Sequence, residues 1–208
     1  MNNKVFGFGI VGVLFFVIAT ILSGMQIPNY SHLSQLISES YAIGTPYGKQ
    51  LRFFIFLPSG IFITAFAFFS IKCLQKLVLA QIGFFILGVF YGISTIIVSI
   101  FPCDEGCNPD MINPSIAQLI HNLTGMLTYM IVPISLIIIG VAATKWTKAK
   151  YVSIMGIILG LLAMLFVGIL SANLRSNFAG LYQRIIESSI LSFIIVCSFY
   201  FKNIEKVN

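Results

Sequence analysis

Six long runs of mainly apolar residues divide this chain, and they constrain its fold more than any other feature. A helix needs about 20 apolar residues to cross the hydrocarbon of a bilayer. No loop between the runs has room for a separate domain. The sequence therefore predicts an all-α, polytopic membrane protein, one bundle of six transmembrane helices over residues 1–208. The expected spans are about 5–27, 52–71, 77–101, 116–144, 151–172 and 181–201.

The composition excludes an ordinary soluble domain. Only 9% of the residues are charged and 58% are apolar, whereas soluble domains carry about 25% charged residues. The first run, Val5–Ile27, is also longer than the apolar segment of a signal peptide, about 7–15 residues, and has no small-residue cleavage pattern. We therefore expect it to be a retained span.

The basic residues predict the orientation. Four of the twelve lie in the outer loops or at their helix ends, and eight lie on the opposite side with the termini. Since cytoplasmic loops are rich in Lys and Arg, we expect both termini in the cytoplasm of a plasma-membrane protein. The eight are Lys4, Lys72, Lys76, Lys145, Lys148, Lys150, Lys202 and Lys206. The net charge of +6 comes from these short loops, so we expect membrane lipids, and no nucleic acid, as partners.

The first outer loop, residues 28–51, is predicted to carry a short interfacial helix. Ser31 is suited to cap it, and Gly44 and Pro46 would end it. Its apolar face would be Leu33, Leu36, Ile37 and Tyr41. A plain linker is the alternative.

Two glycine pairs indicate close helix packing. Gly88 and Gly92 lie in the third span, and Gly156 and Gly160 in the fifth. This spacing lets backbones approach closely, either within one chain or between chains of a homo-oligomer.

Polar residues gather in the outer halves of the spans. His121 shares a helix face with Thr124 and Thr128, and the sixth span opens with Gln183, Arg184 and Glu187. Polar side chains avoid lipid, so these faces should turn inward and form an outward-facing polar pocket, with Asp104 at its rim.

Each ionisable residue in this group has a structural and a functional interpretation. His121 would either bond to a neighbouring helix or act as an acid, base or ligand. Arg184 and Glu187, spaced i and i+3, would either pair with each other or leave Arg184 free for an anion. The two histidines form no metal-binding motif, so we predict no metal site, and the sequence identifies no cofactor.

Cys103 and Cys107 lie in an outer acidic loop with C-x3-C spacing. An oxidising compartment favours a disulfide between them, and metal binding is the alternative.

Several short motifs resemble the domain of unknown function 998 family of bacterial and archaeal membrane proteins. They are Phe101-Pro102-Cys103-Asp104, His121 early in the fourth span, Gly180-Leu181-Tyr182-Gln183-Arg184, and Ser34-x-Leu36. The resemblance covers nearly the whole chain and implies a six-span fold with motif residues Asp104, His121, Gln183 and Arg184. The cysteine pair departs from the family's Phe-Pro-x-Asp pattern. The resemblance implies no activity.

Three functional hypotheses follow. The first is a pocket that binds a lipid head group or a small anionic molecule, lined by His121, Gln183, Arg184, Glu187 and Asp104. The second is an intramembrane hydrolase or transferase at the outer face, possibly metal-dependent, with His121 and Glu187 as catalytic candidates. The third is a structural or accessory subunit whose polar residues only hold helices together.

Overall fold

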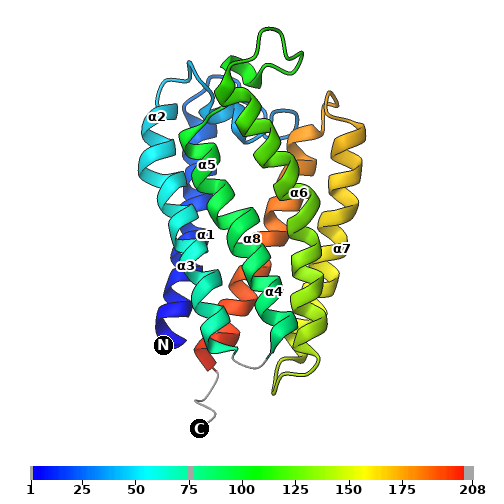
Figure 1. Cartoon of the computed structure of the whole chain (residues 1–208). Coiled ribbons are helices and arrows are strands. Elements are labelled where there is room, and N and C mark those ends of the chain that lie inside the picture. The colour runs from blue at the N-terminus through cyan, green and yellow to red at the C-terminus, as the bar shows by residue number, and fades with distance from the viewer. Residues whose placement is uncertain (1, 75–76, 204–208) are drawn as a thin grey trace.

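The part of the chain that the structure describes contains six helices long and apolar enough to cross a membrane (Figure 1). The computed structural model describes residues 2–74 and 77–203, and these residues contain helices and loops but no strand. The predicted all-α, six-span bundle is confirmed.

The single helices are α1 (Asn2–Met25), α6 (Ile116–Ala143), α7 (Lys150–Ala172) and α8 (Ala179–Asn203). The second span comprises α2 (Gly48–Leu51), η2 (Arg52–Phe56) and α3 (Leu57–Cys73). The third comprises α4 (Val78–Leu87), η3 (Gly88–Ile93) and α5 (Ser94–Ile100).

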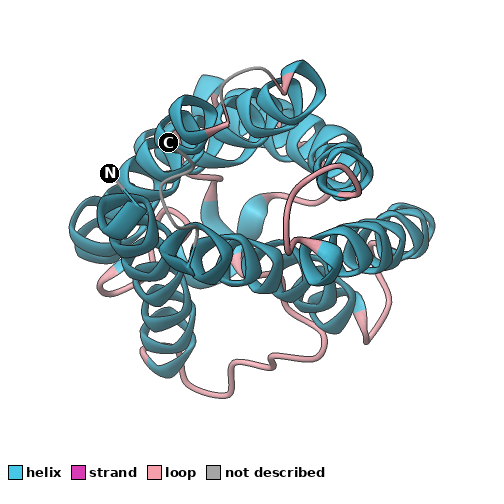
Figure 2. Ribbon diagram, turned by 90° about the horizontal axis from the view of Figure 1, so that it is seen from below, coloured by secondary structure: helices cyan, strands magenta, loops and turns pink. Residues whose placement is uncertain are grey.

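The six spans pack as a ring in the order of the sequence. Each span contacts the next, α7 packs on α8, and α8 closes the ring against α1. Figure 2 shows this arrangement along the bundle axis, and in Figure 1 α1 begins and α8 ends at the same end. In the predicted orientation that end is cytoplasmic; the opposite end is called the outer end below. Two of the eight basic residues behind this orientation, Lys76 and Lys206, lie outside the described residues.

Two spans contain a turn of π-helix. In the second span, η2 ends two residues before Pro58, which has no backbone N–H to donate to a helix bond. A π turn is one way in which a helix absorbs such a break. In the third span, η3 begins at Gly88 and contains Tyr91.

The glycine pairs bring helices together within one chain. A Cβ atom at Gly156 would lie 2.7 Å from the Cα atom of Gly140, so α7 and α6 meet backbone to backbone. A Cβ at Gly92 would lie 2.8 Å from the backbone nitrogen of Thr64, so η3 meets α3 in the same way. Both glycine pairs therefore pack helices of the same chain against each other.

The first outer loop differs from the expected interfacial helix. The loop forms only a four-residue 3-10 helix, η1 (Ser38–Tyr41), and isolated turns. Ile37 and Tyr41 are buried in the core of the bundle, not laid on a membrane surface. The backbone N–H of Ile37 donates to the side chain of Gln183 on α8, at 2.6 Å, instead of to a helical carbonyl. Tertiary contacts have therefore replaced the local helix.

Candidate functional site

Arg184, one turn into α8, holds the first outer loop against the bundle. Its Nη1 donates to the carbonyl oxygens of His32 at 2.8 Å, Gln35 at 2.9 Å and Gly180 at 2.9 Å. Its Nη2 donates to the hydroxyl of Tyr30 at 2.9 Å. The Nε–H and the second N–H of Nη2 have no acceptor among the described residues.

The charge of Arg184 is not neutralised by a carboxylate. Among residues 2–74 and 77–203 the only ion pair joins Arg175 to Asp110, both exposed. An ion pair of Arg184 with Glu187, one of the two alternatives considered for these residues, is therefore absent from the described structure. The effect of the guanidinium is seen on His32, whose pKa is lowered first by partial burial and then by the positive charge of Arg184.

Glu187 is buried, with 8% of its surface exposed, and its hydrogen bonds come from tyrosines. The hydroxyl of Tyr91 in η3 donates to one carboxyl oxygen at 2.7 Å, and that of Tyr129 on α6 donates to the other at 2.8 Å. The side-chain amide of Gln183 donates to the oxygen of Tyr129 at 2.8 Å. Glu187 and Gln183 thus join α8 to α6, η3 and the first outer loop.

His121 lies at a different place, on the outer part of α6. Its Nδ1 bonds to the carbonyl oxygen of Phe101 at 3.1 Å, and its ring is 6.3 Å from that of Tyr41. The bond ties α6 to the end of α5. This contact agrees with the structural interpretation of His121.

Arg52 is one of the four basic residues at the outer end of the chain's helices and loops, and the structure buries it beside Tyr41. It is 8% exposed, Nη1 donates to the carbonyl oxygen of Tyr41, and Nε has no hydrogen-bond partner within residues 2–74 and 77–203. Burial, and then the negative charge of Glu187, raise the pKa of Tyr41. A basic residue next to an apolar run also fits a helix end, so the sequence carries no signal of this burial.

Asp104 fixes the loop between α5 and α6. Its carboxylate accepts bonds from the backbone N–H of Ser115, at 3.0 Å, and from the hydroxyl of Ser115. The hydroxyl of Ser115 in turn caps α6 by accepting from the backbone N–H of Gln118. These hydrogen bonds from Ser115 lower the pKa of Asp104.

The predicted disulfide between Cys103 and Cys107 is present. Cys103 is fully buried, and its carbonyl oxygen accepts from the backbone N–H of Ile43 at 3.0 Å. The disulfide loop is therefore joined to the first outer loop.

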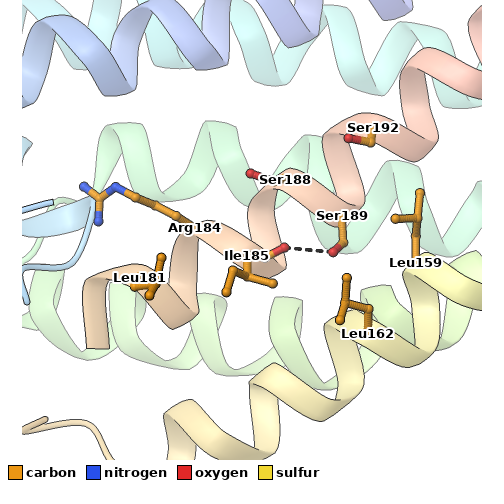
Figure 3. A pocket seen from close by; sticks show the side chains of 8 residues that line it. All are labelled: Leu159, Leu162, Leu181, Arg184, Ile185, Ser188, Ser189 and Ser192. Atoms are coloured by element: carbon orange, nitrogen blue, oxygen red, sulfur yellow. Dashed lines mark hydrogen bonds between the residues drawn. The ribbon is translucent and has the colours of Figure 1, made fainter. Parts of the chain in front are cut away.

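Two grooves flank α8 and share Arg184 and Ser188. The groove between α7 and α8, of about 310 Å³, is drawn in Figure 3, where Arg184 lies at one end and the leucines of α7 form the opposite wall. It is lined by Leu159, Leu162, Leu181, Arg184, Ile185, Ser188, Ser189 and Ser192. The groove between α1 and α8, of about 260 Å³, is lined by Phe16, Val17, Thr20, Ile21, His32, Ile37, Arg184, Glu187, Ser188 and Leu191.

The predicted site residues do not all line the two grooves beside α8. The structure brings Arg184 and Glu187 to the groove between α1 and α8, and Gln183 reaches Glu187 through Tyr129. His121 and Asp104 line neither groove. Within the described ranges, no three His, Cys, Asp or Glu side chains form a group that could hold a metal ion.

One protein family matches the sequence. A family model described as Protein of unknown function (DUF998) matches residues 10–200. No curated protein and no solved structure matches the chain.

Proposed function

The chain belongs to the family Protein of unknown function (DUF998), whose model matches residues 10–200, and we propose that this integral membrane protein binds a lipid. The phosphate of the lipid head group would bond to Arg184, and the acyl chains would lie in the grooves beside α8. One observation carries this proposal. An unneutralised guanidinium, with two N–H groups that have no acceptor in the described structure, lies where two mainly apolar grooves meet.

Arginine suits a phosphate at this position. Its planar fork offers paired donors, and the carbonyl oxygens of the first outer loop hold it in place before a ligand arrives. Both grooves run from Arg184 past Ser188, an exposed polar side chain in the same walls. A hydroxyl there can donate to the ester carbonyl of a lipid.

The bond to phosphate would decide the affinity. An acyl chain gains little by moving from lipid into an apolar groove, because both surroundings are hydrocarbon. A hydrogen bond to a charged group contributes about 1.5–3 kcal/mol. The head group would therefore provide selectivity, and the grooves would fix the position of the chains.

Replacing Arg184 with glutamine tests the proposal. We expect Arg184→Gln to lower the retention of phospholipid by about tenfold or more, since 1.4 kcal/mol corresponds to tenfold in affinity. Retention is measured by native mass spectrometry of protein purified from vesicles of defined composition. The matched control is Arg175→Gln, which removes an exposed arginine at the same end of the bundle.

Arg184 also anchors a loop, so a second variant tests the groove without touching that anchor. Leu162→Trp should fill the groove between α7 and α8 and reduce the retention of phospholipid while the thermal unfolding temperature stays near that of the wild type. Equal retention by Arg184→Gln, Arg175→Gln and the wild type would refute the proposal.

A second candidate function, a structural role for the remaining polar residues, rests on a separate observation. His121 bonds to a backbone carbonyl of a neighbouring segment and lines neither groove. We therefore infer that His121 holds α5 and α6 together.

The structural role of His121 and the lipid-binding role of the groove predict opposite effects for the two histidines. His121→Ala should lower the unfolding temperature, because a net bond of about 1 kcal/mol and its packing are lost, and should leave lipid retention unchanged. His32→Ala, in an exposed residue of the groove between α1 and α8, should leave the unfolding temperature unchanged and alter lipid retention. A His121→Ala protein with wild-type stability would contradict the structural role.

A further inference from the structure

The groove between α1 and α8 contains two groups of opposite charge. Arg184 and Glu187 are three residues apart on α8, so they lie on one side of the helix, one turn from each other. Arg184 lies near the outer loop, where it bonds to the carbonyl oxygen of His32. Glu187 lies one turn deeper. A head group that enters this groove therefore meets a cation first and an acid second.

Glu187 has hydrogen-bond partners but no cationic partner. A carboxylate offers about four acceptor positions, and the hydroxyls of Tyr91 and Tyr129 fill two of them. No Lys, Arg or His within the described ranges forms an ion pair with it. Buried acids are almost always paired, because an isolated buried charge is costly. The missing partner of Glu187 would be supplied by a ligand.

The wall beside Glu187 is aromatic. Phe16 of α1 lines the same groove, and its ring is stacked on that of Tyr91, with 6.1 Å between the centroids. Tyr91 is the residue that donates to Glu187. Aromatic faces attract cations, so Phe16 and the carboxylate together suit an ammonium group.

We propose that this groove selects a membrane phospholipid with a primary ammonium in its head group, an ethanolamine-type lipid, whose phosphate meets Arg184 and whose ammonium meets Glu187 and Phe16. The inference rests on the proposed binding of phosphate at Arg184 and adds the chemical class of the head group. Two features favour a lipid over a free amino phosphate. The groove lies between two membrane-spanning helices, α1 and α8, and Val17, Ile21 and Leu191 in its walls are apolar.

The proposal ranks head groups that differ in charge and in donors. A glycerol head group gives the phosphate to Arg184 but no cation to Glu187. A choline head group brings a cation that attracts Phe16 but has no N–H to donate to a carboxylate. We therefore expect retention to fall from ethanolamine through choline to glycerol lipids.

The test is competition among these three lipids in vesicles that contain equal amounts of each, with matched acyl chains. The full chain is purified from the vesicles, and retained lipids are counted by native mass spectrometry. The wild type should retain the ethanolamine lipid about tenfold more than the glycerol lipid. In Glu187→Gln this ratio should fall to near one, because the amide keeps the size of the side chain and one acceptor oxygen but removes the charge. Glu105→Gln, in an exposed acid of the outer loop, is the matched control and should keep the wild-type ratio.

A second variant addresses the aromatic wall. Phe16→Leu should reduce the preference for ethanolamine and choline lipids over the glycerol lipid by several fold, while an unchanged unfolding temperature shows that the fold is intact.

The two proposals fail in different ways. Wild-type protein that retains the glycerol lipid as well as the ethanolamine lipid, or a Glu187→Gln ratio equal to the wild-type ratio, overturns the selection of ammonium. Either result leaves the binding of phosphate standing if Arg184→Gln still loses all three lipids. Unchanged retention in Arg184→Gln overturns both.

Discussion

Arg184 and Glu187 show how the partners of a residue depend on more than its helix position. At i and i+3 the two side chains are neighbours, and isolated helices favour an ion pair at this spacing. Instead, carbonyl oxygens of the first outer loop surround Arg184, and two tyrosines donate to Glu187. Several aligned bonds to fixed groups replace one flexible contact. In the proposed site, both side chains are thereby left to bind a third molecule.

Asp104 gives a prediction that depends on pH. Hydrogen bonds from Ser115 lower the pKa of Asp104 in the folded protein, so the unfolded chain binds the proton more tightly. The carboxylate therefore stabilises the fold above its ordinary pKa of about 3.9. That contribution is lost as the pH falls through the lower pKa of the folded state.

We expect Asp104→Asn to be less stable than the wild type above about pH 5 and to approach it in stability as the pH falls below about 4. Unfolding temperatures of the two proteins in one detergent, across this pH range, give the measurement. Glu105→Gln, in the adjacent exposed acid, should follow the wild type at every pH. A constant difference between Asp104→Asn and the wild type at all pH values would show that the charge of Asp104 does not contribute.

At the scale of the element, π turns and glycines set the positions of the polar groups. Tyr91 reaches Glu187 from within η3, a π turn that rotates the following residues relative to a regular α-helix. Arg52 is likewise the first residue of η2. Periodicity at 3.6 residues assigns each residue to a face only where the helix is regular, so such turns limit the prediction of faces from the sequence.

The contact between α6 and α7 can be tested through one glycine. A Cβ at Gly156 would lie 2.7 Å from the Cα of Gly140 and 2.8 Å from the carbonyl oxygen of Leu136, both backbone atoms that cannot move alone. We expect Gly156→Ala to destabilise the fold by about 1–3 kcal/mol, the usual cost of overpacking. Thermal or denaturant unfolding in detergent gives the measurement.

Gly168, on the same helix, is the control. A Cβ there would meet nothing within 4 Å. Gly168→Ala should be neutral or stabilise the fold by up to about 1 kcal/mol, because alanine loses less backbone entropy in a helix. Equal stability of the two variants would mean that α6 and α7 do not pack through Gly156.

At the scale of the whole molecule, the outer loops form a layer over the ring of helices. Arg184, Gln183 and the backbone of Cys103 all bond to the first outer loop. The loop is thereby held between α8 and the disulfide segment. Such a layer places the head-group region of the proposed lipid site on a fixed surface.

The membrane class, the six spans and the disulfide could all be predicted from the sequence. These features depend on local quantities, namely the length of apolar runs and the spacing of two cysteines in a short loop. The polar outer residues were also identified, because polar groups inside apolar runs stand out without any knowledge of the fold.

Which of those residues meet became clear only from the three-dimensional structure. It separated His121 and Asp104 from the grooves, placed Tyr91 and Tyr129 on Glu187, and buried Arg52. It also replaced the expected interfacial helix with turns that cover the bundle. The physical reason is that hydrogen bonds between distant segments depend on helix rotation and loop path. The alternation of apolar and polar residues determines helix rotation and loop path only approximately. Packing of the whole bundle determines them closely enough for a hydrogen bond to form.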